Sequence, residues 1–424
     1  MLDIKELRTN PMQAENLLQR KDPHIHLKSL LQLDEKIRQF KTISEELKAK
    51  RNASSKDIGD RKRKGEDIEK PSREVKEMGE KIAKIDKDLR ELEESFEKEL
   101  SLLPNLPFAE IPVSEHAKDN VCLKEFGQKR HFSFPFKNHV ELNEALHIFD
   151  FKRAAKISGS NWPLYTQLGA RLEWALINYM LDTHRKNGFK MILPPLLAKP
   201  EILYGSAHLP KFESQLFQLK DEDFHLYLIP TSEAVLNGLH LSEVLETSSL
   251  PIRYTAYTPC FRREAGAAGS NERGLIRMHQ FNKVELFCLT KKEESERVFE
   301  EMLASAEEVL QGLELHYRNM LLVTGDMSFA AAKTIDIEVW LPGQDRYYEV
   351  SSVSHCTDFQ ARRANIRYHD GEKLSFVHTL NGSGLATSRL MVALLENNQK
   401  EDGSIMIPKI LHPYLQEEIL TLSP

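Results

Sequence analysis

The feature that most constrains this chain is a heptad pattern of apolar residues in its first hundred positions. Over residues 72–96 the apolar side chains recur at alternating intervals of three and four: Val75, Met78, Ile82, Ile85, Leu89, Leu92 and Phe96. This spacing lines one side of a helix with a continuous apolar seam, while charged residues cover the rest. Such a seam is stable only against another helix, so the chain must supply a partner.

The preceding segment supplies that partner. Over 27–64 a looser helical pattern runs through Leu30, Leu33, Ile37, Phe40, Ile43 and Leu47. Residues 64–67 read as the turn between the two helices, and Pro71 is tolerated near the start of the second. At about 1.5 Å per residue each helix would be roughly 50 Å long. We therefore expect an antiparallel coiled-coil arm over about 27–100 that projects from the rest of the chain.

The end of the first helix is strongly basic. Residues 48–64 carry eight Lys or Arg against Asp57 and Asp60. A solvated coiled-coil face would explain this charge, and so would a tip that grips a phosphate backbone. The segment alone leaves both interpretations open. The candidate phosphate-binding residues are Lys48, Arg51, Arg61, Lys62, Arg63 and Lys64.

Composition limits the remaining possibilities. A chain of 424 residues predicts two or three domains, and its net charge of −6 excludes nucleic-acid binding through overall charge. The four cysteines lie far apart without a CxxC pair, which disfavours a zinc finger or disulfide framework and fits a reducing cytoplasm. The first residues lack a signal-peptide pattern, and no apolar run is long enough to span a membrane.

Three regions follow from these patterns: an arm domain at 1–103, a proline-marked linker at 104–139, and a compact domain at 140–424. In the last region a helix at 168–186 ends at Asn187-Gly188, and another is expected at 293–313. Short β-like runs lie at 224–229, 253–258, 284–290, 321–324, 335–341 and 346–350. Regular crossover helices are missing between them, so we predict an α+β fold with an antiparallel sheet and flanking helices.

The chemistry concentrates in three segments, at about 170–197, 257–287 and 379–399. The first segment contains Gly188-Phe189 and Pro195. The second contains Phe261-Arg262-Arg263-Glu264 and Arg277-Met278-His279-Gln280-Phe281. The third contains Gly382-Ser383-Gly384-Leu385-Ala386-Thr387-Ser388-Arg389. A lone Arg-x-Glu would be an ordinary surface ion pair. In order and spacing, however, the three segments resemble motifs 1, 2 and 3 of the class II aminoacyl-tRNA synthetases.

The resemblance narrows to the seryl-tRNA synthetase family of the bacterial type and covers essentially the whole chain, including the arm. It is carried by Pro230-Thr231-Ser232-Glu233, Gly274-Leu275-Ile276-Arg277, Glu349-Val350-Ser351-Ser352, the run 358–363 and the run 379–386. The methanogen type with an active-site zinc is disfavoured, because no suitable Cys/His set is evident and no zinc is expected. His279, within motif 2, and His355, after the Glu349 run, could each be interpreted as a metal ligand. We interpret both as structural histidines.

The resemblance implies that serine reacts with ATP to give seryl-adenylate and pyrophosphate. Arg262 would bridge the serine carboxylate and the α-phosphate, Glu264 would accept from the adenine amino group, and Arg389 would hold the γ-phosphate. Fixed cations and Mg²⁺ suit the charge that builds on phosphate oxygens. The implied ATP-binding set is Arg262, Arg263, Glu264, Met278, Phe281, Glu349, Val350, Ser351, Ser352 and Arg389, with Glu349 and Ser352 as Mg²⁺ ligands.

The implied serine pocket consists of Thr231, Ser232, Glu233, Glu285, Asn381 and Ser383. Polar groups built to bind a hydroxyl reject alanine, because they would be left unpaired. The seryl group would then pass to the 3′-terminal adenosine of tRNA(Ser), and of tRNA(Sec) where that tRNA exists. The resemblance also implies a homodimer built on motif 1, with the arm reaching tRNA bound across the subunits by shape and backbone.

Two details depart from the family pattern. Ser270 stands where arginine is common and Arg263 where a small polar residue is common, which affects the expected contact of loop 265–273 with the acceptor end. The alternative function is a catalytically inactive paralogue that binds RNA. Such a protein would be expected to lose Arg262, Glu264, Glu285 or Arg389, and all four are present.

Overall fold

The computed structural model describes residues 1–264 and 274–421. The chain divides into two compact units, one formed by Leu2–Leu103 and the other by Pro104–Pro424 together with Met1. None of the helices in the described ranges is both long enough and apolar enough to cross a membrane.

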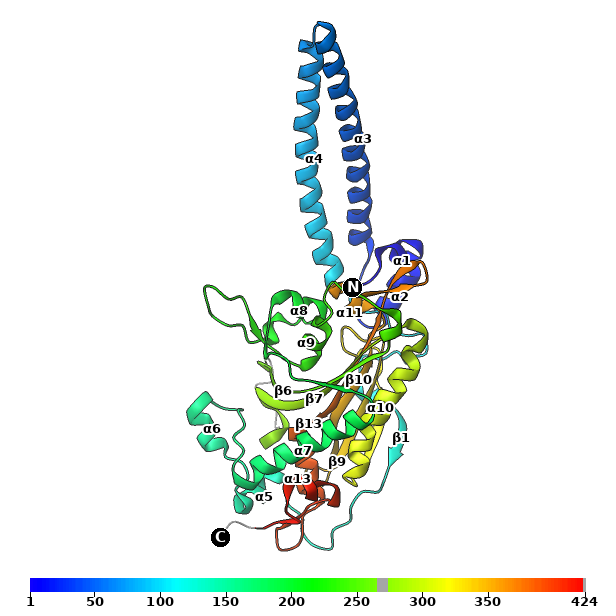
Figure 1. Cartoon of the computed structure of the whole chain (residues 1–424). Coiled ribbons are helices and arrows are strands. Elements are labelled where there is room, and N and C mark those ends of the chain that lie inside the picture. The colour runs from blue at the N-terminus through cyan, green and yellow to red at the C-terminus, as the bar shows by residue number, and fades with distance from the viewer. Residues whose placement is uncertain (265–273, 422–424) are drawn as a thin grey trace. The chain divides into compact units, whose positions relative to one another are not determined.

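The first unit is dominated by two long antiparallel helices. Two short helices, α1 (Ile4–Thr9) and α2 (Pro11–Gln19), precede α3 (Lys28–Lys64) and α4 (Glu69–Ser101), which lie side by side (Figure 1). α3 ends at Gly65, whose φ of 74° lies in the left-handed region that glycine adopts without a Cβ clash. The predicted coiled-coil arm is confirmed.

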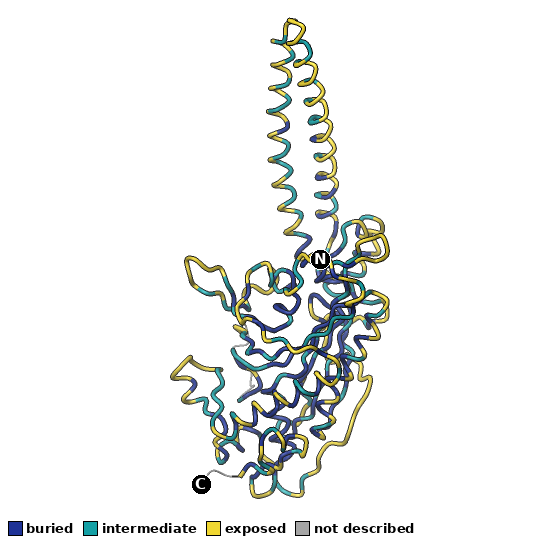
Figure 2. The backbone as a smooth tube through the Cα atoms, viewed as in Figure 1, coloured by how far each residue is buried: buried dark blue, intermediate teal, exposed yellow. Residues whose placement is uncertain are grey.

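The facing sides of α3 and α4 are the most buried parts of the hairpin, and its tip is exposed (Figure 2). Ile37 and Ile82 are 6% and 4% exposed, although most of the seam is only half-buried because two helices cannot enclose one another. Polar contacts between α3 and α4 also stabilise their pairing. Asp86 accepts from Ser44 Oγ at 2.8 Å and lies 2.9 Å from Lys48 Nζ.

The second unit is built on an eight-stranded sheet in the order β1-β8-β9-β10-β13-β7-β6-β2. Neighbouring strands are antiparallel except β2 and β6, which are parallel. The strands are β1 (Val121–Phe126), β2 (Lys190–Ile192), β6 (Ile252–Phe261), β7 (Gln280–Thr290), β8 (Tyr317–Leu321), β9 (Lys333–Leu341), β10 (Arg346–His355) and β13 (His378–Ala386). The predicted fold class is confirmed.

Three features of this sheet differ from the sequence expectations. The central strand β13 has no counterpart among the predicted β-like runs. The run predicted at 321–324 overlaps β8 only at Leu321, because the strand lies earlier in the chain. β1 lies within the segment read as a linker, where it forms the edge of the sheet against β8. All six residues of β1 are exposed, so the strand carries no apolar alternation that would reveal it.

Smaller elements complete the unit. The short strands are β3 (Leu197–Ala198), β4 (Tyr227–Leu228), β5 (Val244–Leu245), β11 (Arg367–Asp370), β12 (Lys373–Phe376), β14 (Ile405–Met406) and β15 (Ile419–Leu420). The helices are α5 (His139–Leu146), α6 (Phe151–Ser158), α7 (Gln167–Lys186), α8 (Pro200–Gly205), α9 (Ser232–Gly238), α10 (Ser295–Gly312), α11 (Phe359–Ala364), α12 (Thr387–Asn397) and α13 (His412–Leu415). Helix α7 matches the predicted 168–186 within one residue.

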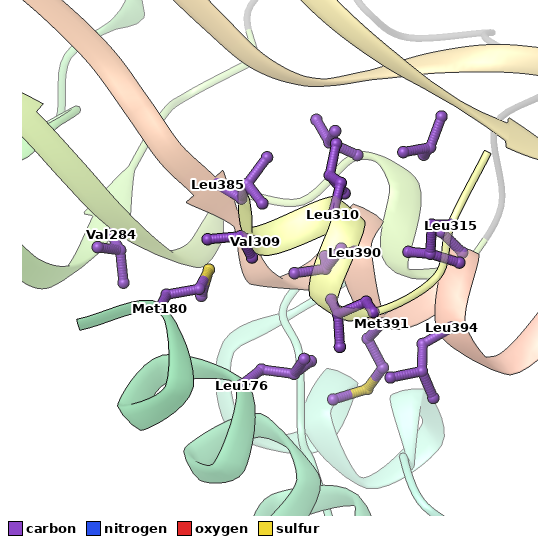
Figure 3. Close-up of a cluster of buried hydrophobic side chains, with 14 of the residues drawn as sticks. Leu176, Met180, Val284, Val309, Leu310, Leu315, Leu385, Leu390, Met391 and Leu394 are labelled. Carbon is purple, nitrogen blue, oxygen red and sulfur yellow. The ribbon is translucent and has the colours of Figure 1, made fainter. Parts of the chain in front are cut away.

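The main core lies between the sheet and the helices α7, α10 and α12. Figure 3 shows side chains from all three helices converging with Val284 of β7 and Leu385 of β13. Those from the helices include Leu176, Met180, Val309, Leu310, Leu390, Met391 and Leu394. This packing fixes one face of β7 and β13, which leaves their other face to form a site.

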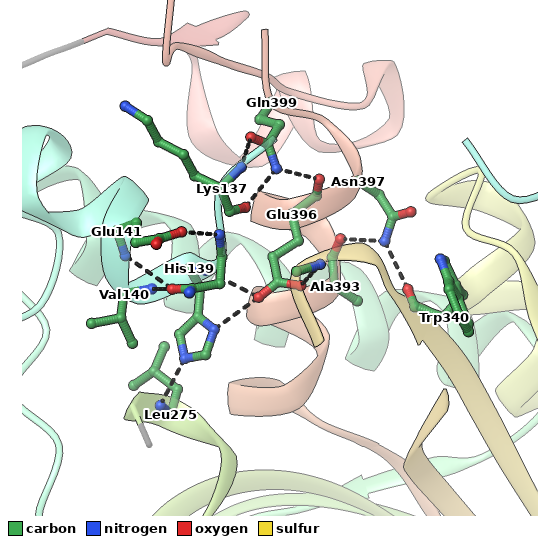
Figure 4. Close-up of polar contacts among 12 residues, drawn as sticks. Lys137, His139, Val140, Glu141, Leu275, Trp340, Ala393, Glu396, Asn397 and Gln399 are labelled. Atoms are coloured by element: carbon green, nitrogen blue, oxygen red, sulfur yellow. Dashed lines mark hydrogen bonds and ion pairs between the residues drawn. The ribbon is translucent and has the colours of Figure 1, made fainter. Parts of the chain in front are cut away.

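A buried polar network secures the start of α5 against α12 (Figure 4). The Glu396 carboxylate accepts from the backbone N–H of His139 at 3.0 Å and lies 3.0 Å from His139 Nδ1. The Leu275 N–H donates to His139 Nε2, so Nδ1 carries the ring proton toward Glu396. Leu275 is thereby tied to the helix that also carries Arg389.

The arm yields a stability prediction. Ile82→Ala removes a buried side chain from the seam and should weaken the pairing of α3 and α4 by about 2 kcal/mol, which raises the population of open arm roughly 30-fold. Trypsin cleavage within residues 28–101 should accelerate accordingly. The matched control is Glu80→Ala, an exposed position on the same helix. Equal cleavage rates in the two variants would show that the seam does not hold the arm together.

Candidate active site

A cavity of about 740 Å³ opens against β7, β10 and β13. It collects residues that are far apart in the sequence, from the segment before α9 to the first turn of α12. Thirteen of the predicted site residues line it: Thr231, Glu233, Arg262, Glu264, Met278, Phe281, Glu285, Glu349, Val350, Ser352, Asn381, Ser383 and Arg389.

Three of the predicted serine- and ATP-binding residues lie outside this lining. Ser232 is fully buried, and its Oγ lies 2.7 Å from Thr258 Oγ1. Ser351 is also buried and donates to the Ser383 carbonyl at 2.5 Å. Arg263 lines a neighbouring cavity instead. Ser270 and the loop 265–273 are outside the described residues.

The alternation of β7 explains how the site forms. Val284 and Leu286 point into the main core, so Lys283 and Glu285 point to the opposite face, where both line the cavity. Strand pairing then places Ser383 of β13 directly opposite Glu285. The sheet register therefore brings motif 2 and motif 3 residues together.

One end of the cavity is rich in arginine. The Arg262 Nε donates to the Pro230 carbonyl at 3.3 Å, and its guanidinium lies 5.1 Å from the centre of the Phe281 ring. Arg389 follows β13 in the first turn of α12 and donates to the Glu349 carbonyl at 2.7 Å. Arg277 Nε lies 3.1 Å from Glu264 Oε2, and all three arginines line the cavity. This concentration of guanidinium groups suits a polyphosphate.

The other end is rich in carboxylates. Thr231 Oγ1 donates to Glu285 Oε2 at 2.8 Å, and Lys283 Nζ lies 2.5 Å from the same oxygen. Glu233 Oε1 accepts from Gln360 Nε2 at 2.6 Å and from Asn381 Nδ2 at 3.1 Å. These side chains form a polar pocket that is held by hydrogen bonds within the protein.

Two titratable groups of this end are strongly perturbed. Burial, followed by the nearby Glu285 carboxylate, raises the pKa of Glu233 to about 7. Burial lowers the pKa of His208 to about 3, and the Arg262 and Lys283 cations add to the effect. His208 is therefore neutral at physiological pH, while Glu233 titrates within it.

A pair of oxygen donors lies on β10, the strand beside the motif 3 strand β13. Glu349 and Ser352 both line the cavity, and Asp336 stands opposite Ser352 in the pairing of β9 with β10. Asp336 Oδ1 is buried without a hydrogen-bond partner. These hard oxygen donors fit Mg²⁺ better than a softer metal. Within the described ranges, no three His, Cys, Asp or Glu side chains gather into a metal site.

Sequence reasoning missed four residues of this site: Lys283, His208, Gln360 and Asp336. The signal for Lys283 was available, because Lys283-Val284-Glu285-Leu286 alternates between polar and apolar residues. The predicted strand began at 284, four residues after β7 begins at Gln280, and so left Lys283 outside. Of the other three, His208 lines the cavity, whereas Gln360 and Asp336 lie behind it against the lining residues Glu233 and Ser352. Tertiary packing brings all three to these positions.

The sheet, the three motifs in order and the arginine-lined cavity together define a class II aminoacyl-tRNA synthetase. Residues 213–398 match the family described as "tRNA synthetase class II core domain (G, H, P, S and T)". Residues 1–107 match the "Seryl-tRNA synthetase N-terminal domain". The serine–tRNA ligase of Chlamydia caviae is 54% identical over 99% of both chains. The chain belongs to the seryl-tRNA synthetase family.

Solved structures agree with this assignment. The crystal structure of seryl-tRNA synthetase from Pyrococcus horikoshii complexed with ATP matches with a TM-score of 0.93 at 37% identity, covering 100% of both chains. The cytoplasmic serine–tRNA ligase from Naegleria fowleri in complex with AMP matches with a TM-score of 0.88 at 26% identity, covering 100% of this chain and 99% of the other. The predicted family and enzyme class are confirmed, and the inactive paralogue is not favoured.

Proposed function

We propose that the cavity activates L-serine with ATP, and that the seryl group is then transferred to the 3′-terminal adenosine of tRNA(Ser). The observation that carries this proposal is that one cavity brings the Glu233 and Glu285 carboxylates together with the Arg262 and Arg389 guanidinium groups. An amino acid presents an ammonium that needs an anion, and a triphosphate needs fixed cations. The ATP complex of the Pyrococcus horikoshii relative supports the nucleotide half.

The carboxylate end takes serine. Glu233 and Glu285 supply negative charge for the ammonium, and Thr231, Asn381 and Ser383 add polar groups within reach of a small side chain. Ser232 acts indirectly, since its hydroxyl contacts Thr258 rather than the cavity. Alanine lacks the hydroxyl that these polar groups would bind, so the pocket should reject it.

The arginine end takes ATP. Arg262 is the catalytic residue that meets both the serine carboxylate and the α-phosphate, and Arg389 holds the γ-phosphate. Glu264 accepts from the adenine amino group, and Phe281 and Met278 border the base. The backbone around Val350 and Ser351 and the neighbouring Arg263 complete the nucleotide side. The serine carboxylate then attacks the α-phosphorus, and pyrophosphate leaves as the phosphoanhydride bond breaks.

Mg²⁺ fits the donor set of Glu349 and Ser352. These residues would hold it together with phosphate oxygens of ATP, and the unpartnered Asp336 Oδ1 adds an acidic group at the same place. Bound there, the metal would neutralise charge on the phosphates. The protein's own contribution is to fix the two ligand positions on β10, where a register irregularity lies between Glu349 and Ser351.

We assign tRNA binding to residues 1–103 and catalysis to 140–424, joined by 104–139. The tip of the arm would contact tRNA through Lys48, Arg51, Arg61, Lys62, Arg63 and Lys64. A homodimer formed through motif 1 would let an arm reach tRNA on the partner, and tRNA(Sec) would be a second substrate where it exists. Because its partner is tRNA, we place the enzyme in the cytoplasm.

Amino-acid-dependent ATP–pyrophosphate exchange tests the proposed function. With all twenty amino acids assayed separately and no tRNA, exchange should occur with serine alone. Arg262→Ala should lower its rate about 100- to 1,000-fold, since the variant loses a fixed cation at the α-phosphate. Arg153→Ala, at an exposed arginine of α6, is the matched control. Exchange with another amino acid, or full activity of Arg262→Ala, would contradict the proposal.

The titration of Glu233 predicts pH-dependent serine binding. Below pH 7 the Glu233 carboxyl gains a proton and no longer attracts the serine ammonium, which stays charged throughout this range. The KM for serine should therefore rise as pH falls through about 7, approaching about tenfold per pH unit. In Glu233→Gln the KM should be high and independent of pH. A flat profile in the wild-type enzyme would contradict the role of Glu233.

The arm predicts a separable effect on tRNA. Arg61 and Arg63 pair with Asp57 and Asp60, so the exposed Lys62 and Lys64 are the sharper probes. The variant Lys62→Gln/Lys64→Gln should lower the salt dependence of tRNA binding by about two counterions and weaken aminoacylation. Serine-dependent exchange should not change.

The matched control for this arm variant is Lys292→Gln/Lys373→Gln, which removes the same charge from exposed lysines of the second unit. An equal loss of tRNA affinity in both variants would show that the tip makes no special contact with tRNA.

A further inference from the structure

Lys283 is a buried ammonium in the serine pocket to which the proposed roles above give no task. The residue is 7% exposed. Its Nζ lies 2.5 Å from Glu285 Oε2 and donates to Thr231 Oγ1 at 2.8 Å. Lys283 and Glu285 share one face of β7, so the backbone of a central strand fixes both.

The three side chains form a closed triangle. Thr231 Oγ1 accepts from Lys283 and donates to Glu285 at 2.8 Å, and it also accepts from the backbone N–H of Glu233 at 3.2 Å. Thr231 is thus the N-cap of α9, the helix whose first turn carries Glu233. A substitution of Lys283 should therefore affect both carboxylates of the pocket. It removes a direct contact with Glu285, and it frees Thr231, whose side chain accepts from the Glu233 N–H.

The charges around Lys283 come from several elements. Its own strand contributes Glu285, α9 contributes Glu233, and the end of β6 contributes Cys260 and the following Arg262. Burial raises the pKa of the Cys260 thiol and lowers that of His208, so both groups are neutral at physiological pH. Lys283 is then the cation paired at hydrogen-bond distance with a carboxylate of this end. A buried ammonium costs free energy unless it is paired and hydrogen-bonded, as this one is.

We propose that Lys283 is a positioning residue of the serine pocket, which pairs with the Glu285 carboxylate and fixes Thr231 before serine binds. Without it, Glu233 and Glu285 would face each other as two uncompensated carboxylates and would compete for one proton. With it, the pocket stays able to receive an ammonium at neutral pH. This inference rests on the proposed serine-binding function of the same pocket.

The test compares KM values and pH profiles in the exchange assay. Lys283→Met keeps the length of the side chain but removes the charge. Its KM for serine should rise about 10- to 100-fold while the KM for ATP stays within about twofold of wild type. The pH at which serine binding is half lost should move upward by about one unit or more.

Two further variants separate charge from packing. Lys283→Arg retains a cation, so its pH midpoint should stay near that of the wild type. Lys283→Met/Glu285→Gln removes both partners, so its midpoint should return toward the wild-type value even though serine binds weakly. Lys373→Met, at an exposed strand lysine, is the matched control and should behave as the wild type.

The outcomes distinguish this inference from the proposed function. If the wild-type enzyme exchanges with serine and Lys283→Met keeps both its serine KM and its pH midpoint, the role of Lys283 is overturned. The same conclusion follows if KM values for serine and ATP rise together with an unchanged midpoint, because that pattern indicates a packing defect. No serine-dependent exchange in the wild-type enzyme would overturn the proposed function and this inference with it.

Discussion

The site depends on one constraint: one face of β7 packs in the main core, and the other face lines the cavity. Val284 and Leu286 are fully buried in the main core, and their packing against α7, α10 and α12 fixes the strand. Period-two alternation then leaves Lys283 and Glu285 no orientation except toward the cavity. A slip of one residue would bury both charges among apolar side chains, so the hydrophobic core enforces the register of the polar site.

The carboxylates and arginines of the cavity are paired within the protein. Glu233 and Glu285 accept hydrogen bonds from neighbouring side chains, and Arg262 and Arg389 donate to backbone carbonyls. Preorganised groups of this kind need little rearrangement when substrates arrive. Burial and the nearby Glu285 carboxylate raise the pKa of Glu233 to about 7, because both favour the neutral form of a carboxyl group.

Much of this architecture could be read from the sequence, and the reasons are physical. The seam of α4 follows a strict heptad, and α7 ends at an Asn-Gly signal, so both helices were predicted closely. The motif residues were found because their types and order are specific. β1 was missed because all its residues are exposed, and its pairing with β8 is made by the backbone. Gln360 and His208 were missed because tertiary packing alone brings His208 to the cavity and Gln360 to the Glu233 carboxylate.

The two units reflect two different physical demands. The basic residues of the arm stay solvated and charged, which a half-buried coiled coil permits because its stability needs only a narrow seam. The polar residues of the cavity are paired and held in register, which requires the large sheet and its core. A single compact domain would have to expose the first set and bury the second on the same elements. Dividing the chain near residue 103 lets each set of residues satisfy its own environment.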